Sequence, residues 1–532
     1  MKRIYKITQV ALFGAFIVGC TDLDTAPLSS TITADQKEDV VAADPSKIEA
    51  SVTAITANFT QYAKIYTEDD NVHSDIGYPT IMLATDSRTT DFVADITGYN
   101  WYSNSADYSD CLSTSTATIE FWGTLYNQIY TANAVIGTVD NETSDPTLQF
   151  YLAQALAIRA FDYFTLVQLY QFNYKGHEDA PGVPIITPEN AEEAAANGCA
   201  RSTVKETYEF ILGDLNKAIE LLANTKKTRS DKRYVSLDVA YGIRARVHLT
   251  MHNYADALKD AEAALASTSS VPYSSAAVSK PTFIDIEDAS WMWGILITDK
   301  DRVSTTGICN FPSHMGSLNY GYASVGGWRR ISPKLYNQIP ESDVRKGWFL
   351  DDTGVSVNLP AAAQAYITKK GAPVYTQVKY GPMNDEWGSN NNATDVILMR
   401  VEEMYLIKAE AQAMNNDVSG GVNTLNSFVN TYRDPSYKCT ATTGEAVQEA
   451  VWHQRRIEFW GEGLAYFDIM RLNKGVNRLG CGFPKTAVFN IAAGDPVQIY
   501  SIPNKEVQYN PLLENNPLPS LRFCCLSFRY PF

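Results

Sequence analysis

The sequence has few of the motifs that mark catalytic or metal-binding centres. Only six of its 532 residues are histidine, and these are scattered. It contains no Gly-x-Ser-x-Gly motif, no phosphate-binding Gly-Lys-Ser/Thr loop and no Cys-x-x-Cys pair, so common signatures of hydrolases, nucleotide-binding proteins and zinc sites are missing. The acidic run Glu68–Asn71 could hold calcium, but it is more typical of a solvated loop. We therefore predict no metal site and no cofactor.

The sequence also lacks a basic excess and a long apolar run. Lys and Arg number 44 against 60 Asp and Glu, which gives a formal net charge of −16 and argues against a nucleic-acid partner. Beyond the N-terminal region, no apolar run approaches the roughly 18 residues that a membrane-spanning helix needs. Apart from Cys20, seven widely spaced cysteines remain. This odd number argues against a complete disulfide framework and leaves one or two bridges open.

The N-terminus has the pattern of an export signal. Lys2, Arg3 and Lys6 precede the short apolar run Val10–Val18, which ends at Gly19-Cys20. Ile17-Val18-Gly19-Cys20 resembles a lipoprotein signal box, although its first two residues depart from the commoner ones. We predict that residues 1–19 are a signal peptide, that Cys20 carries a lipid, and that residues 20–45 form a tether. The alternative is an ordinary signal peptide with a coincidental cysteine.

Helical periodicity dominates much of the remaining chain. Apolar residues recur at helical spacing between Leu152 and Val167, and Thr203–Glu206 has the spacing of a capping box. The segment Tyr254–Leu265 resembles the second helix of a tetratricopeptide repeat. A similar pair is expected at 399–414 and 422–429, joined through Gly420-Gly421. We predict a mainly α fold, in which tetratricopeptide-like helix pairs form a scaffold over about 46–266 and 395–475.

Aromatic residues are the informative excess, with 31 Tyr, 21 Phe and 9 Trp. Helical periodicity fades between about 267 and 394, where Gly, Ser, Asn and aromatic residues increase, and we predict a loop-rich insert there. A second aromatic segment runs from Tyr78 to Asp110. Exposed rings beside polar groups can stack on sugar C–H faces and bond sugar hydroxyls; alternatively, such rings close hydrophobic clusters beneath loops. The predicted ligand-binding residues are Asp86, Arg88, Trp101, Tyr102, Trp291, Trp293, Tyr320, Tyr322 and Trp328.

The stretch Gln454–Arg471 mixes charged and large apolar side chains more densely than a surface usually does. If these charges are buried, they must be paired, because an unpaired buried charge costs several kcal/mol. We expect an internal ion-pair network. The alternative is a pair of catalytic carboxylates, for example Glu458 and Glu462, as in glycosidases, but nearby arginines would keep such carboxylates ionised.

Five segments in this order resemble the SusD/RagB family of nutrient-binding surface lipoproteins. They are the Cys20 start, Ala157–Phe164, Arg400–Ala411, Arg455–Arg471 and Ile502–Pro517. The resemblance implies a SusD-like fold over residues 46–517, with a C-terminal segment at 476–517, and it implies no catalysis. It also implies an outer-membrane, cell-surface lipoprotein that binds oligosaccharide and delivers it to a TonB-dependent, SusC-like transporter.

Three other functions stay open at this point. Some members of the family bind peptide, the Glu458–Glu462 pair could belong to a surface glycoside hydrolase, and a helical-repeat scaffold could bind only protein. Residues 518–532, with Cys524-Cys525, extend past the end expected for the family. We assign no role to this tail.

Overall fold

The computed structural model describes residues 34–517. The predicted signal peptide, Cys20, the first part of the predicted tether and the tail at 518–532 lie outside these residues. The last part of the predicted tether is helical: helix α1 spans Ala34–Ala43, and its Val41 is buried in the main core. The packed body therefore begins before residue 46, because this apolar side chain is removed from water.

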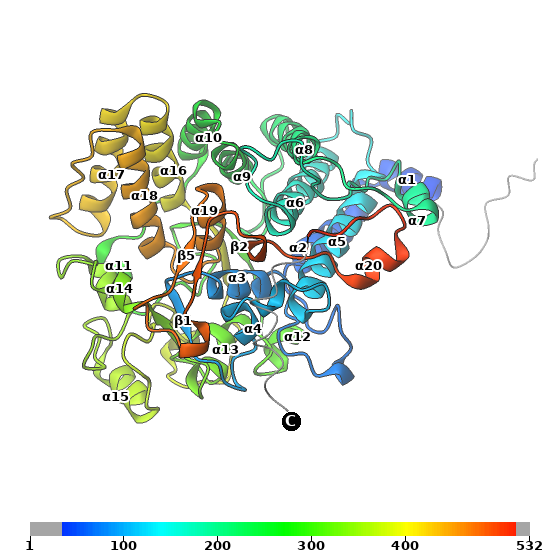
Figure 1. Ribbon diagram of the computed structural model, residues 1–532. Coiled ribbons are helices and arrows are strands. Elements are labelled where there is room, and N and C mark those ends of the chain that lie inside the picture. Colours follow the sequence, from blue (N-terminus) through cyan, green and yellow to red (C-terminus); the bar gives the residue numbers. More distant parts are fainter. Residues whose placement is uncertain (1–33, 518–532) are drawn as a thin grey trace, which may run out of the picture.

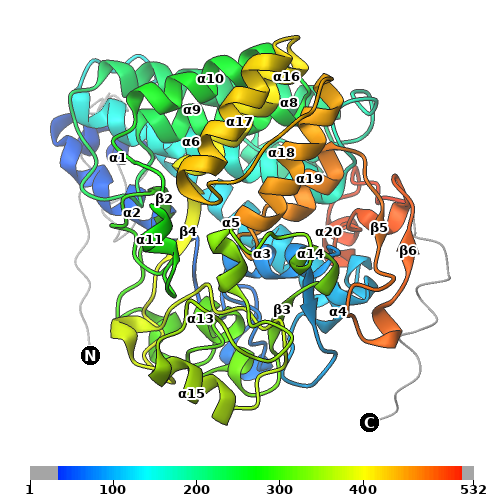
Figure 2. The same cartoon turned by 90° about the vertical axis from the view of Figure 1, so that its left-hand side faces the viewer.

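Long helices form the scaffold, as the periodicity predicted. They pack in chain order, each against a neighbour, across the upper part of the molecule (Figures 1 and 2). The scaffold helices are α5 (Thr116–Ile136), α6 (Pro146–Tyr170), α8 (Val204–Asn224), α9 (Leu237–Thr250), α10 (Tyr254–Ser267), α16 (Val401–Met414), α17 (Val418–Tyr432) and α18 (Gly444–Glu458).

Local sequence explains where these helices begin. The Thr203 hydroxyl and the Glu206 carboxylate form the reciprocal capping box at the start of α8. Asp145 caps α6, with Pro146 at the first helical position, where a missing N–H costs nothing. Nearly all of α6 is buried because other elements surround it.

The expected pairing of α9 with α10 is confirmed, whereas the join between α16 and α17 differs from the prediction. Gly420 and Gly421 lie inside α17 instead of linking the two helices. A Cβ atom at Gly421 would lie 2.6 Å from the carbonyl oxygen of Ala409 in α16. The glycine is thus needed for close helix approach, and the link itself is the short segment 415–417.

Short elements and loops make up the lower part of the molecule. Three two-stranded antiparallel pairs occur in the described residues: β1 (Phe92–Ala94) with β3 (Arg329–Ile331), β2 (Trp291–Ile295) with β4 (Val396–Arg400), and β5 (Val476–Asn477) with β6 (Asn490–Ile491). The shorter helices are α2 (Glu49–Ala57), α3 (Tyr78–Ser87), α4 (Ser103–Ala106), α7 (Ala191–Asn197), α11 (Ser275–Val278), α12 (Arg302–Thr305), α13 (Phe311–Met315), α14 (Pro333–Tyr336), α15 (Ala361–Lys369), α19 (Ala465–Arg471) and α20 (Asn504–Tyr509).

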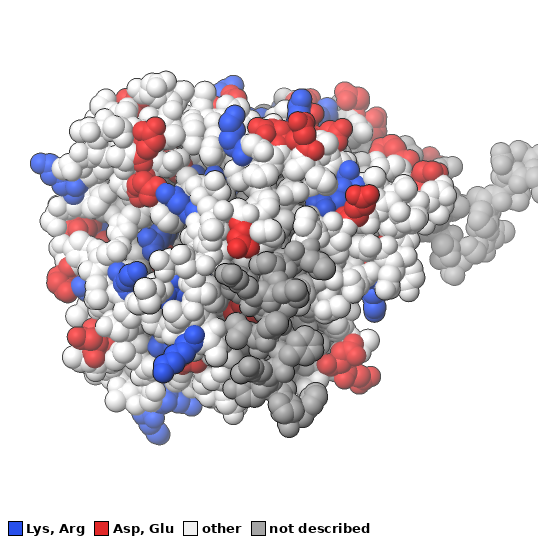
Figure 3. Space-filling model, in the orientation of Figure 1, with Lys and Arg blue, Asp and Glu red and all other residues white. Residues whose placement is uncertain are grey.

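The surface carries both signs of charge despite the acidic total. On the face in Figure 3, Lys and Arg side chains are interspersed with Asp and Glu, and uncharged surface separates them. Many other charged groups are paired inside the protein. Within residues 34–517, no helix combines the length and the apolar character that crossing a bilayer requires.

Candidate ligand-binding site

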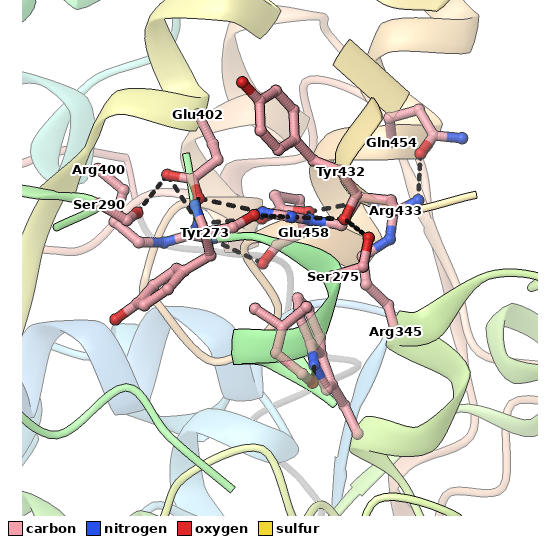
Figure 4. Close-up of polar contacts among 12 residues, drawn as sticks. Tyr273, Ser275, Ser290, Arg345, Arg400, Glu402, Tyr432, Arg433, Gln454 and Glu458 are labelled. Atoms are coloured by element: carbon pink, nitrogen blue, oxygen red, sulfur yellow. Dashed lines mark hydrogen bonds and ion pairs between the residues drawn. The ribbon is translucent and has the colours of Figure 1, made fainter. Parts of the chain in front are cut away.

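The densely charged stretch near residue 458 is an internal ion-pair network. The Glu458 carboxylate is fully buried and accepts hydrogen bonds from three arginines drawn from different elements (Figure 4). Arg433 donates through Nε and Nη2 at 2.8 Å each, Arg400 through Nη1 at 2.9 Å, and Arg345 through Nη1 at 3.2 Å. Burial alone raises its pKa, but the three guanidinium groups hold the pKa of Glu458 well below 4.5.

This network fixes how the two parts of the chain pack. Arg345 lies in a short 3-10 helix at Val344–Trp348 of the loop-rich part, whereas Arg400 ends β4 and Glu458 ends α18. Glu462 is also buried and accepts from Lys379 Nζ at 2.6 Å. Both carboxylates are buried among cations and give a substrate no access, so Glu458 and Glu462 do not form a glycosidase centre.

Two of the predicted binding tryptophans belong to the core. Trp291 and Trp293 are both completely buried in β2, and so is Met292 between them. Trp291 Nε1 donates to the Tyr273 hydroxyl at 2.7 Å, and Trp293 Nε1 donates to the Arg233 carbonyl at 3.0 Å. A strand covered on both faces buries consecutive side chains, so no ligand reaches these rings. The prediction that Trp291 and Trp293 contact a ligand is therefore wrong.

Asp86, Arg88 and Tyr102 are buried as well. Arg88 forms an ion pair with Asp110 and lies over the Tyr108 ring at 4.1 Å. Burial raises the pKa of Asp86 to about 7, and its Oδ2 accepts from the backbone N–H of Gly463 at 3.0 Å. Asp86 and Arg88 thus hold C-terminal segments against α3, whereas the Tyr102 ring packs edge-on against His314 at 5.3 Å. All three are internal contacts and not the ligand contacts that the sequence predicted.

Trp328 is 7% exposed and closes a small separate core. Its neighbours are Leu318, Leu350, Ile367 and Val378. This is the alternative that the sequence left open for loop aromatics, namely a hydrophobic cluster beneath loops. Trp328 therefore packs beneath the surface loops and is not one of the exposed rings that could contact a ligand.

The other predicted residues, Trp101, Tyr320 and Tyr322, belong to a group of aromatic rings that also includes His73 and Tyr99, which the sequence did not single out. Trp101 is partly exposed and stacks on His73, with ring centres 4.8 Å apart and planes 26° apart. Tyr322 lies edge-on to Trp101 at 6.3 Å, and its hydroxyl is hydrogen-bonded to His73 Nδ1. Tyr99 and Tyr320, two residues before Trp101 and Tyr322, are 51% and 47% exposed. We call His73, Trp101 and Tyr322, with Tyr99 and Tyr320, the aromatic platform.

Hydrogen bonds of the neighbouring Asn100 side chain fix the turn that carries Trp101. The Asn100 side chain accepts from the Tyr102 backbone N–H at 3.1 Å and from Arg329 Nη1 at 2.8 Å, and it donates to the Asp95 carbonyl at 2.9 Å. One buried amide thereby fixes both ends of the turn that carries Trp101.

The Tyr322 side of the platform is fixed in a similar way. His314 is buried and stacks on Tyr322 at 4.9 Å, and its Nε2 donates to the His73 carbonyl at 3.0 Å. Burial lowers the pKa of His314 to about 3, so this ring is neutral at physiological pH. Gly326, at φ 143°, lies so close to the Tyr99 ring that a Cβ atom there would be 2.8 Å from it.

The platform offers ring faces and neutral hydrogen-bonding groups. Burial lowers the pKa of His73, which favours the uncharged imidazole. Tyr322 is only 9% exposed, so Trp101, Tyr99 and Tyr320 present most of the accessible ring area. Tyr99 lay inside the aromatic segment noted in the sequence, whereas His73 had no local signal, because its role depends on Trp101 and Tyr322 from distant segments.

The structure also bears on metal binding and on disulfides. His248 and His252 are four residues apart, a spacing found in zinc-binding helices, but His252 follows α9 and its Nε2 pairs with the Arg471 carbonyl at 2.8 Å. Across residues 34–517, no group of three His, Cys, Asp or Glu side chains is arranged to hold a metal ion. Cys199, Cys309, Cys439 and Cys481 are free thiols.

These features define a class: an α-helical binding protein whose candidate site is a set of aromatic rings. Comparison with known proteins identifies the family. Residues 35–249 match a SusD-like family model described as starch-binding and associating with the outer membrane, and residues 341–518 match the SusD family model. Together these ranges take up well over half of the chain, which therefore belongs to the SusD/RagB family. Proteins of this family are non-enzymatic binding proteins, and the description of the SusD-like model gives starch binding and association with the outer membrane.

Individual relatives agree with this assignment. The chain is 25% identical over 392 residues to SusD-like protein P2 of Formosa agariphila, covering 67% of this chain and 72% of the relative. A SusD-like carbohydrate binding protein of Bacteroides vulgatus has a TM-score of 0.73 at 23% identity, covering 89% of this chain and 98% of that one. A SusD superfamily protein of Bacteroides thetaiotaomicron has a TM-score of 0.72 at 21% identity, covering 92% and 100%. These structural likenesses show the fold.

Proposed function

We propose that this protein binds oligosaccharide at the aromatic platform. The observation that carries the proposal is the stacked Trp101–His73 pair, with the exposed Tyr99 and Tyr320 lying two residues before Trp101 and Tyr322 in the sequence. Flat, partly exposed rings present apolar area to the C–H face of a sugar, while neighbouring hydroxyl and amide groups serve its hydroxyls. The carbohydrate binding named for the Bacteroides vulgatus relative is consistent with this chemistry.

A glycan array followed by calorimetry tests the proposal. The protein without residues 1–20 is screened first, and each hit is titrated into wild-type protein and Trp101→Ala. We expect Trp101→Ala to weaken binding by about tenfold or more, because stacking and ring burial are both lost. Tyr130→Ala is the matched control, since Tyr130 is an aromatic residue that is 77% exposed on α5 of the scaffold.

The outcomes separate the remaining alternatives. Loss of binding in Trp101→Ala, with no effect of Tyr130→Ala and no cleavage of the sugar, supports a glycan receptor. Undiminished binding in Trp101→Ala contradicts the platform as the site. An array with no hit contradicts glycan binding and favours peptide as the cargo.

We further propose that a lipid on Cys20 anchors the protein at the cell surface. The support is the basic start, the short apolar run and Gly19-Cys20, together with the outer-membrane association of the family. Cys20→Ala should move the protein from the membrane fraction to the soluble fraction, because a lipid chain contributes about 0.8 kcal/mol per buried CH₂. An unchanged membrane fraction would contradict the anchor, and the surface substitution Tyr130→Ala again serves as the control.

The proposed recipient of the glycan is a TonB-dependent, SusC-like transporter. A surface receptor without catalytic groups needs a second protein to move its ligand across the outer membrane. A transporter of this class should copurify with the tagged, lipidated protein from detergent-solubilised membranes. A receptor that purifies without one, under conditions that preserve other membrane complexes, would contradict this partnership.

A further inference from the structure

A hollow in the surface is linked to the aromatic platform through Tyr62. It is open to solvent and has a volume of about 350 Å³, at the lower end of the size range of small-molecule sites. Its walls come from the end of α2 and the loop after it, from Arg233, from the end of β2, and from residues 298–303. None of the groups assigned to the platform lines it.

Tyr62 connects this hollow with the platform. The Tyr62 side chain lines the hollow, and its hydroxyl is hydrogen-bonded to the Cys309 thiol. The Asn392 side chain joins this segment to the platform, because it donates to the carbonyl of Gly307, two residues before Cys309, at 2.7 Å and to the carbonyl of Tyr320 at 3.2 Å. Arg302 lies over the Tyr62 ring with its guanidinium carbon 5.6 Å from the ring centre. Tyr62 thus stands between the hollow and the platform.

The chemistry of the walls fits a neutral sugar unit. Tyr62 and Leu296 supply apolar surface, while hydroxyl, amide, guanidinium and carboxylate groups supply hydrogen bonds; these polar residues are Thr60, Gln61, Arg233, Thr298, Asp301 and Arg302. The charges balance, because Asp231 pairs with Arg233, and Asp301 lies next to Arg302. A balanced site gives no net attraction to a phosphate or sulfate group.

We propose that this hollow is a second subsite for the same glycan chain. A bound oligosaccharide then spans from the platform past Tyr62 into the hollow, and the protein selects neutral oligosaccharides long enough to fill both. This inference rests on the proposed function. It adds a requirement for ligand length, because the second subsite contributes only when the chain reaches it.

The test is calorimetry with a length series. The first probes are malto-oligosaccharides from two to seven glucose units, because the matched family model is described as starch-binding; any other neutral glycan found on the array is then used as a matching series. Affinity should rise with chain length. Tyr62→Ala should weaken binding of the longest member by about tenfold and leave the shortest within about twofold. Arg302→Ala, at an exposed position, should act in the same direction.

The controls make the two proposals separable. Trp101→Ala should weaken every member of the series, and Tyr130→Ala should weaken none. Unfolding temperatures show whether the Tyr62 variant remains folded, and Arg302→Ala tests the hollow without changing a half-buried ring. Length-dependent loss in both hollow variants supports the second subsite. Equal affinities at all lengths, with no effect of either variant, overturn it while leaving the platform intact. No binding of any neutral glycan overturns both.

Discussion

Removing the charge of Glu458 should destabilise the protein strongly without changing its shape. Glu458→Gln keeps the side-chain volume but deprives three buried arginines of their shared anion. Four hydrogen bonds from Arg345, Arg400 and Arg433 end on this carboxylate. Removing one partner from a buried ion-pair network costs about 3–5 kcal/mol, because the remaining carboxylates Asp343, Glu402 and Glu462 then leave one buried positive charge without a counter-charge. We expect a loss in the free energy of unfolding of about that size.

Urea unfolding followed by tryptophan fluorescence measures this loss. The matched control is Glu449→Gln on the same helix, α18, where an exposed glutamate pairs with Lys474. An exposed pair contributes at most about 1 kcal/mol, so the two substitutions should differ severalfold in their cost. A Glu458→Gln protein as stable as the Glu449→Gln control would refute the view that the network determines how the parts pack.

The pH dependence provides a second check on the same substitution. Because the pKa of Glu458 is lowered in the folded protein, its stabilisation is present above the ordinary value of 4.5 and is lost as the pH falls through the folded value. The stability difference between wild type and Glu458→Gln should therefore be constant from about pH 8 to pH 6 and should shrink in acid. A difference that grows in acid would contradict the ionised state of this carboxylate.

Two further substitutions test buried positions of opposite kinds. Asp162 is fully buried, and neither of its carboxylate oxygens has a hydrogen-bond partner. Burial raises the pKa of Asp162 well above 3.8, so its contribution to stability falls as the pH rises. In thermal unfolding, Asp162→Asn should therefore stabilise the protein by roughly 1 kcal/mol at pH 8 and should have no effect near pH 4. A lower unfolding temperature at pH 8 would contradict this. Gly421→Ala should lower the free energy of unfolding in urea by about 1–3 kcal/mol, because the new Cβ atom would meet the Ala409 carbonyl. Gly213→Ala on α8 should be neutral or stabilising, because no atom lies within 4 Å of a Cβ at that position. Equal effects at the two glycines would refute the close-packing argument.

The helical scaffold could be predicted because its signals are local. The capping box at Thr203 and the apolar spacing between Leu152 and Val167 depend only on neighbours in sequence, and both lie where the helices of the structure lie. The ion-pair network could be anticipated for a related reason. A dense mixture of charged and apolar residues near Glu458 is compatible with a fold only if the charges are paired. Its partners, such as Arg345, could not be named, since they come from distant segments.

The position of Gly421 shows the limit of local reasoning about glycine. A Gly-Gly pair usually marks a turn, and that expectation placed the join between α16 and α17 too late. In the structure, the glycine sits within the helix because the facing backbone of α16 leaves no room for a side chain. Contact across a helix interface, which the sequence does not display, outweighed the intrinsic preference of the residue.

Aromatic composition predicted a ring-rich surface but did not identify its members. Trp293 and Trp101 look alike in sequence, each among aromatic and polar neighbours, yet one is fully buried and the other lies at the surface. The difference is set by pairing: β2 lies beside β4 and under the scaffold, whereas Trp101 ends a loop with His73 as its neighbour. A loop tryptophan becomes a binding group when its far face is already covered by another ring, because the site is then preorganised and its near face stays available. Trp101 meets this condition through His73, and for that reason we propose it, among the predicted tryptophans, as a ligand contact.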